Sequence, residues 1–109
     1  MRAKSLTSEL SVSPEITAAD IPVIKAAGFK SIICNRPDGE APGQPPFSDI
    51  EASAKAAGLA IRHQPIVAGQ ITAADVATFS GLLNELPKPI FAFCRTGMRS
   101  STLWSRVAK

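Results

Sequence analysis

The sequence has few of the residues that define several common protein classes. Its two cysteines, Cys34 and Cys94, are too few for a disulfide-rich scaffold, and no spacing of Cys and His resembles a zinc site. No run approaches the roughly 18 apolar residues of a membrane span. The first residues also lack the apolar core of a secretory signal peptide. We therefore expect a cytoplasmic protein that uses no metal or other cofactor.

Charge and aromatic content are also modest. The 109 residues include 12 Lys and Arg against 9 Asp and Glu, and only 6% are aromatic. Because the basic residues are scattered and no aromatic stripe lies among them, neither nucleic acid nor a membrane is an expected partner. This length fits one compact domain, 1–109, and the small excess of positive charge suits a small anionic substrate.

Strand-like and helix-like segments alternate along the chain. Apolar runs and apolar–polar alternation predict strands at 6–13, 30–35, 59–67 and 90–93. Apolar residues at helical spacing, with Thr–Asp capping pairs before the first and third helices, predict helices at 17–27, 47–57, 72–86 and 100–109. Helices in most strand connections favour an α/β fold, a mainly parallel sheet flanked by helices in three layers. Proline and glycine predict a long loop at 36–46.

One segment, 93–101, combines several features of an anion-binding loop. It connects an apolar strand to a helix, at the edge where ligand sites of parallel sheets lie. Gly97 permits a curl that turns successive backbone N–H groups toward one point, and Arg99 adds a planar, permanently charged fork suited to phosphate or sulfate. We expect the loop and the rim of its pocket to be formed by Arg95, Thr96, Gly97, Met98, Ser100 and Arg106.

Cys94 lies at the base of this predicted cradle. A field that binds an anion also favours the thiolate form of a cysteine, so Cys94 is the predicted nucleophile and Arg99 its electrostatic partner. Ser100 is expected to donate a hydrogen bond to the sulfur. The alternative interpretation is a buried cysteine followed by an ordinary basic turn.

Four other residues are candidates for supporting roles. Arg36 and Asp38 follow a predicted strand at the same edge of the sheet, where an ion pair near the site and a surface turn are equally consistent with the pattern. His63 lies in a strand-like run, in which a packed histidine is more common than a catalytic one. Cys34 is interpreted as a buried strand cysteine, with a resolving thiol as the alternative.

The loop resembles two kinds of active site. Its pattern Cys-Arg-x-Gly-x-Arg is similar to that of rhodanese-type sulfurtransferases, and Cys…Arg-Ser between a strand and a helix resembles the phosphate loop of cysteine phosphatases. A longer pattern resembles the bacterial beta-lactamase-hydrolase-like family through Gly28-Phe29-Lys30, Asn35-Arg36-Pro37-Asp38-Gly39-Glu40, Pro65-Ile66-Val67, Thr72, Asp75 and Phe93-Cys94-Arg95-Thr96-Gly97. The resemblance implies a cysteine-phosphatase-like (dual-specificity-phosphatase-like) fold. It also implies a metallo-hydrolase-like domain as a candidate partner, because family members occur alone or fused to one.

Departures from the phosphatase pattern favour sulfur transfer. Four residues separate Cys94 from Arg99, where cysteine phosphatases have five, and Phe93 stands where they have histidine. The segment 65–71 contains no Asp or Glu to protonate a leaving oxygen. We therefore expect Cys94 to take a sulfane sulfur from an anionic donor as a persulfide and to pass it to a thiol acceptor.

Two alternatives remain open. The first is a cysteine phosphatase that hydrolyses a phosphate ester through a phosphocysteine on Cys94, as the whole-chain resemblance implies. The second is a noncatalytic anion-binding module, because fold alone does not determine chemistry. The last predicted helix stops at Lys109, whereas similar chains continue for about another helix, so we expect a fold truncated at its C-terminus.

Overall fold

The apolar runs of the sequence form one five-stranded sheet in the computed structural model, which describes residues 2–108. The strand order is β1-β2-β5-β3-β4, with β1 antiparallel to β2 and all other neighbours parallel. The continuous apolar run that forms β5 occupies the middle of the sheet, as predicted. The strands are β1 (Lys4–Thr7), β2 (Leu10–Ser13), β3 (Ser31–Cys34), β4 (Ala60–His63) and β5 (Ile90–Phe93).

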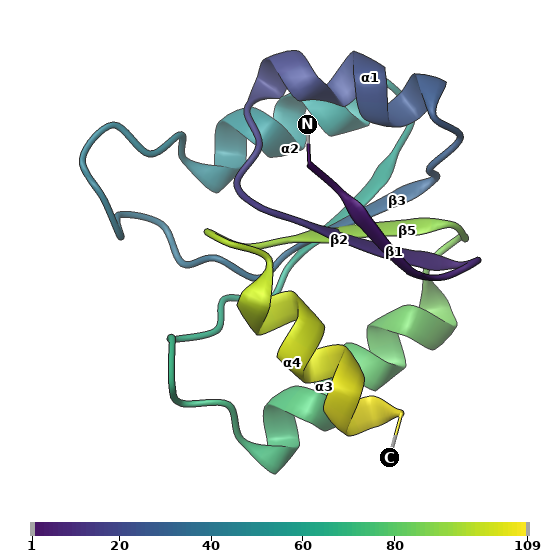
Figure 1. Cartoon of the computed structure of the whole chain (residues 1–109). Helices are drawn as coiled ribbons and strands as arrows, with labels where there is room; N and C mark the ends of the chain where they lie inside the picture. Colours follow the sequence, from purple (N-terminus) through teal and green to yellow (C-terminus); the bar gives the residue numbers. More distant parts are fainter. Residues whose placement is uncertain (1, 109) are drawn as a thin grey trace.

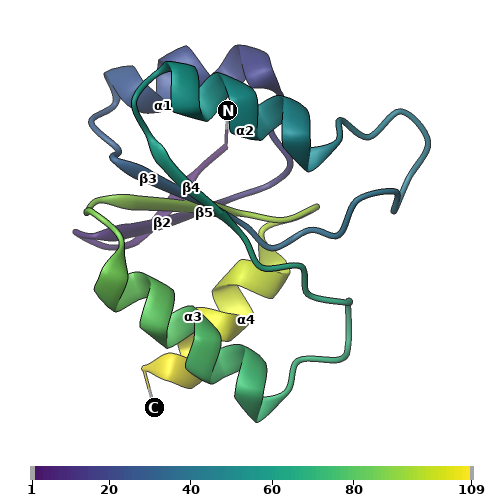
Figure 2. The same cartoon turned by 180° about the vertical axis from the view of Figure 1, so that it is seen from behind.

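Helices cover both faces of the sheet, which confirms the predicted three-layer α/β architecture (Figures 1 and 2). The 3-10 turn η1 (Ala18–Asp20), α1 (Ile21–Ala26) and α2 (Phe47–Ala56) lie on one face, and α3 (Ala73–Glu85) and α4 (Met98–Val107) on the other. Within residues 2–108, none of these helices has the length and apolar character needed to cross a membrane.

Successive side chains of a strand point to opposite faces of the sheet, so the hydrophobic core has two parts, one on each face. Phe91 and Phe93 of β5 pack on the side of α1 and α2, whereas Ile90 and Ala92 pack on the side of α3 and α4. All four side chains are buried, because a parallel strand in the middle of a three-layer fold has no solvent-facing side.

The predicted capping pairs mark the starts of two helical segments. Thr72 and Asp75 form a capping box before α3, in which each residue's side chain accepts from the other's backbone N–H, at 3.1 and 3.0 Å. The Asp20 carboxylate likewise accepts from the backbone N–H of Thr17, at 2.9 Å. These bonds satisfy N–H groups that have no partner within the helix.

The prediction of a single strand over 6–13 is wrong, because a hairpin forms there instead. β1 and β2 pair in antiparallel register with an irregularity between Ser5 and Thr7. The turn contains no glycine, proline or asparagine to mark it. The Thr7 hydroxyl instead accepts a hydrogen bond from the Glu9 N–H at 3.0 Å and so stabilises the turn. In the sequence, this polar residue looks like one more polar position of an alternating strand.

The strand predicted over 59–67 is shorter than expected. β4 ends at His63, although Gln64 and Ile66 still donate backbone hydrogen bonds to the Cys34 and Asn35 carbonyls. Pro65 between them has no N–H to donate. The segment that follows, 67–72, therefore leaves the sheet at the edge where β3 and β5 also end.

Leu103 provides a test of how α4 is anchored. Its side chain is fully buried between α4 and the sheet, so Leu103→Ala is expected to lower the free energy of unfolding by about 2–5 kcal/mol. The control is Val23→Ala, at a residue that is 54% exposed on α1, with an expected loss below about 0.5 kcal/mol. Urea unfolding measures both, and equal losses would contradict the placement of Leu103.

Candidate active site

The connection between β5 and α4 forms a tight loop at the carboxyl edge of the parallel strands (Figure 1). Gly97, at the start of α4, has φ of +90°, a conformation that residues with a Cβ rarely adopt. Two backbone hydrogen bonds tie the loop to the end of β2, from Cys94 N–H to the Ser13 carbonyl at 3.3 Å and from Glu15 N–H to the Arg95 carbonyl at 3.2 Å. The curl predicted around Gly97 is therefore present.

Cys94 lies at the floor of this loop. Its side chain is fully buried, and the backbone N–H of Gly97 donates a hydrogen bond to its sulfur at 3.1 Å. The first turn of α4 begins at Met98, four residues after Cys94, and the Met98 N–H donates to the Thr96 hydroxyl at 3.3 Å. The Gly97 N–H thus fixes the sulfur at the base of the loop.

Arg99 is held in one orientation by three hydrogen bonds. Its Nη1 and Nη2 donate to the two carboxylate oxygens of Glu40 at 2.8 and 2.9 Å, and Nη1 also donates to the Ile66 carbonyl at 2.8 Å. A guanidinium has five N–H groups, so one on Nη2 and one on Nε remain. No residue within 2–108 accepts from these two, which lie along one edge and form a fork that fits a tetrahedral oxyanion.

Glu40 belongs to a chain of alternating charges. Arg36 contacts Glu40 through Nε at 2.9 Å and Glu15 through Nη1 at 2.6 Å. The hydrogen bond from Arg99 is the main cause that lowers the pKa of Glu40. Partial burial opposes it, and the Arg36 hydrogen bond adds to it. The chain Glu15–Arg36–Glu40–Arg99 thus joins the ends of β2 and β3 to the first turn of α4.

The expected hydrogen bond from Ser100 to the cysteine sulfur is wrong. The Ser100 hydroxyl is buried and donates instead to the Asn35 side-chain oxygen at 2.8 Å. Asn35 in turn donates from its side-chain nitrogen to the Gln64 carbonyl at 3.1 Å. Because a hydroxyl has one proton, Ser100 anchors α4 to the ends of β3 and β4 and has none left for Cys94.

The remaining predicted residues support the backbone after β3. Asp38 accepts a hydrogen bond from the Phe47 N–H at 2.8 Å, which caps the start of α2. The His63 ring stacks on Phe47 with centroids 4.3 Å apart, and its Nε2 lies 2.9 Å from the Arg36 carbonyl. Cys34 contacts the same carbonyl through its sulfur, and burial raises the pKa of its thiol to about 12. These contacts agree with the interpretation of His63 as a packed histidine and of Cys34 as a buried strand cysteine.

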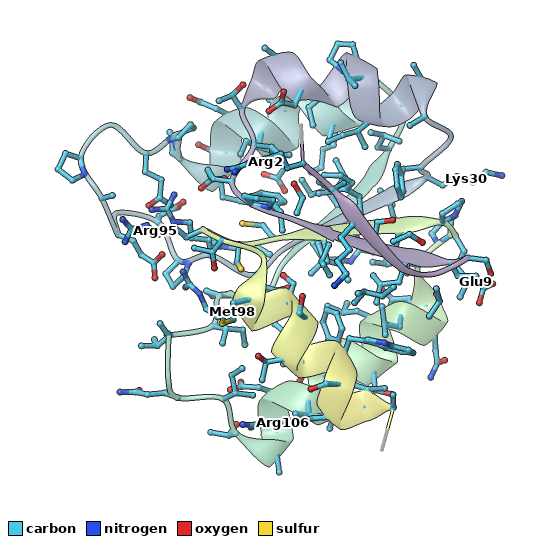
Figure 3. All side chains as sticks on the ribbon, in the orientation of Figure 1. Arg2, Glu9, Lys30, Arg95, Met98 and Arg106 are labelled. Atoms are coloured by element: carbon cyan, nitrogen blue, oxygen red, sulfur yellow. The ribbon has the colours of Figure 1, made fainter. Side chains whose placement is uncertain are left out.

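A cleft of about 580 Å³ opens beside the loop, between α4 and the segment 68–71. We call it the α4 cleft. Figure 3 shows Arg95 and Met98 beside the loop and Arg106 near the far end of α4. No three His, Cys, Asp or Glu side chains gather to hold a metal ion within the part of the chain that the structure describes. The α4 cleft is lined by Glu40, Ala68, Gly69, Ile71, Arg95, Thr96, Met98, Arg99, Thr102 and Arg106.

The residues that hold Arg99 have little signature in the sequence. Glu40 belongs to the segment 35–40 that carried the family resemblance, but it was given no role. Glu15 follows β2 at the same sheet edge as the loop. Only this position in the sequence could have indicated that it lies near the site. The role of the Ile66 carbonyl could not be predicted from the sequence, because every residue has a backbone oxygen.

Comparison with known proteins identifies a family. A family model described as "Beta-lactamase hydrolase-like protein, phosphatase-like domain" matches residues 2–108. A beta-lactamase hydrolase-like protein of Agrobacterium fabrum is 39% identical over 104 residues, which cover 95% of this chain and 24% of that protein. The chain therefore spans about a quarter of the length of the curated relatives it matches.

Solved structures share the fold. A crystal structure of a candidate phosphatase from Neisseria meningitidis superposes with a TM-score of 0.87 at 44% identity, covering 92% of this chain and 71% of that one. The catalytic core of a PP-IP phosphatase from S. cerevisiae has a TM-score of 0.72 at 17% identity, over 93% of this chain and 61% of that one. The predicted cysteine-phosphatase-like fold is confirmed.

Glu40→Gln tests the charge chain. Removing the carboxylate charge is expected to cost about 1–3 kcal/mol of unfolding free energy at pH 7, because one neutral amide oxygen replaces the charged pair of oxygens that Arg36 and Arg99 share. The folded protein lowers the pKa of Glu40, so this stabilisation is complete above the ordinary glutamate value of about 4.3. The stabilisation is lost as the pH falls through the lowered pKa that Glu40 has in the folded protein.

Denaturant unfolding of both proteins between pH 7 and pH 3 measures this difference. The stability gap between wild type and Glu40→Gln should narrow as the pH falls below about 4.3. A gap that stays constant over that range would contradict a charged Glu40 between the two arginines.

Proposed function

Since the chain belongs to the phosphatase-like domain family of beta-lactamase hydrolase-like proteins, we propose that it is a cysteine phosphatase that hydrolyses a small anionic phosphate ester. The observation that carries the proposal is the edge of Arg99 formed by Nε and Nη2, for which no residue within 2–108 is an acceptor. Glu40 holds this arginine in the first turn of α4, five residues after Cys94. A bidentate fork next to a buried sulfur suits a tetrahedral phosphate above a nucleophile.

The proposed reaction has two steps. The Cys94 thiolate attacks phosphorus, the bond from phosphorus to the ester oxygen breaks, and the leaving alkoxide or phenolate takes a proton from water. Water then attacks the phosphocysteine and releases inorganic phosphate and the thiolate. Arg99 and the backbone N–H groups of the loop stabilise the charge on the three non-bridging oxygens of the transferred phosphoryl group in both steps.

The carboxylates near the site are engaged elsewhere. Within residues 2–108, Glu40 is the one carboxylate that lines the α4 cleft, and both of its oxygens accept from arginines. Asp38, the other acidic candidate, caps α2. A phosphate ester whose leaving group needs little protonation, such as an aryl phosphate, is therefore the most informative assay substrate.

Sulfur transfer is the second candidate, favoured by the same engaged carboxylates and by the four-residue spacing from Cys94 to Arg99. The Cys94 thiolate would attack the outer sulfur of a donor such as thiosulfate, the sulfur–sulfur bond would break, and sulfite would leave without a proton. A thiol acceptor would then remove the sulfur from the persulfide. The sequence favours this reaction, but the comparisons lend it no support. Phosphate hydrolysis is therefore the preferred proposal.

Parallel assays of wild type and Cys94→Ser separate these candidates. With para-nitrophenyl phosphate, wild type should release phosphate and Cys94→Ser should be slower by about 10³-fold or more, because the nucleophile is lost. With thiosulfate, the intact mass of wild type should stay unchanged. A gain of one sulfur without phosphate release would favour sulfur transfer, and neither product would leave the noncatalytic anion-binding module.

Arg99→Lys tests the role of the fork. Lysine keeps the positive charge but cannot bind Glu40 and an oxyanion along two edges at once, so kcat/KM for the aryl phosphate should fall by about 10²–10³-fold. Arg62→Lys is the matched control, because Arg62 pairs with Glu85 on the surface away from the α4 cleft. A loss of less than about threefold in Arg99→Lys would be incompatible with bidentate phosphate binding.

A further inference from the structure

The α4 cleft has a second positively charged end. Arg99 and Arg106 are seven residues apart on α4, so they share one helix face, two turns or about 10 Å apart along the axis. Thr102 lies between them, and all three side chains line the α4 cleft. Figure 3 shows Arg106 at the opposite end of α4 from Arg95 and Met98.

Arg106 is positioned but not neutralised. Its Nη1 donates to the Ile71 carbonyl at 3.1 Å, which ties the guanidinium to the opposite wall of the cleft and leaves four N–H groups. Among residues 2–108, Arg36 and Arg99 have carboxylate partners within 4 Å, whereas Arg106 and Arg95 have none. This uncompensated charge favours an anion at the far end of the α4 cleft.

The α4 cleft also has apolar lining residues between its polar ones. Ala68, Ile71 and Met98 contribute apolar side chains to its lining, and Met98 is 70% exposed. A cleft with a cation at each end and apolar residues in its lining fits an elongated molecule whose two anionic groups are joined by an apolar spacer.

We propose that the substrate of this site carries a second anionic group, which Arg106 binds while the reacting phosphate lies over Cys94. The inference rests on the proposed function for the reacting end and adds the chemistry of the leaving group. Arg106 then selects among phosphate esters by charge and length, because a second anion closer than two helical turns would not reach it.

Binding to the Cys94→Ser variant tests this proposal without turnover. The probes are alkane bisphosphonates of graded length and monophosphonates with the same alkyl chains. Bisphosphonates should bind about fivefold more tightly than their monophosphonate counterparts. The advantage should be greatest where the two phosphorus atoms span about 10 Å, the rise of two helical turns.

Two further variants assign the effect to Arg106. Adding Arg106→Gln should reduce the bisphosphonate advantage to nearly onefold. Adding Arg62→Gln, which removes one positive charge from an exposed position outside the α4 cleft, should preserve it. Equal losses in these two variants would overturn the proposal, because net charge alone would then explain the binding.

The outcomes also separate this proposal from the proposed function. If wild type hydrolyses the aryl phosphate but bisphosphonates bind no better than monophosphonates at any length, the second anion site is overturned and the phosphatase proposal stands. The same holds if neither probe binds. A length-dependent advantage lost in Arg106→Gln supports the site even if wild type releases no phosphate.

Discussion

The bidentate pair between Glu40 and Arg99 is the interaction on which the rest of the site depends. It occupies one edge of the guanidinium and, together with the Ile66 carbonyl, leaves the other edge for an anion. A nearly buried arginine needs such a partner, because an uncompensated charge in this position would be costly. Arg36 and Glu15 extend the alternation, so the orientation of Arg99 is held by two segments distant from α4 in sequence.

Sheet topology brings these segments together. β5 lies between β2 and β3, and all parallel strands end at the same edge. Glu15 follows β2, Glu40 lies in the loop after β3, Ile66 follows β4 and Cys94 follows β5. Residues separated by up to about 80 positions therefore meet around one loop, as ligand sites of open α/β sheets do. The same arrangement explains how a proline-rich loop on the surface supplies the partner of a helix residue.

Much of this arrangement could be predicted from local patterns. Apolar runs and capping pairs located the helices and the central strand, and Gly97 with Arg99 located the loop, because these signals act within a few residues. The Thr7 turn was hidden because a hydroxyl replaces the usual glycine or asparagine. The partners of Ser100 and Arg99 were missed because they lie 65 and 59 residues away. The reaction was also ambiguous, since a thiolate beneath an anion pocket serves phosphate and sulfur chemistry alike.

The most direct measurement of the central claim is a crystal structure of Cys94→Ser with bound phosphate. We expect Nε and Nη2 of Arg99 to donate to two oxygens of one phosphate above residue 94, while Nη1 and Nη2 remain on Glu40. Phosphate bound away from the loop, or an Arg99 that leaves Glu40 to reach it, would show that the Glu40–Arg99 pair does not orient the phosphate site.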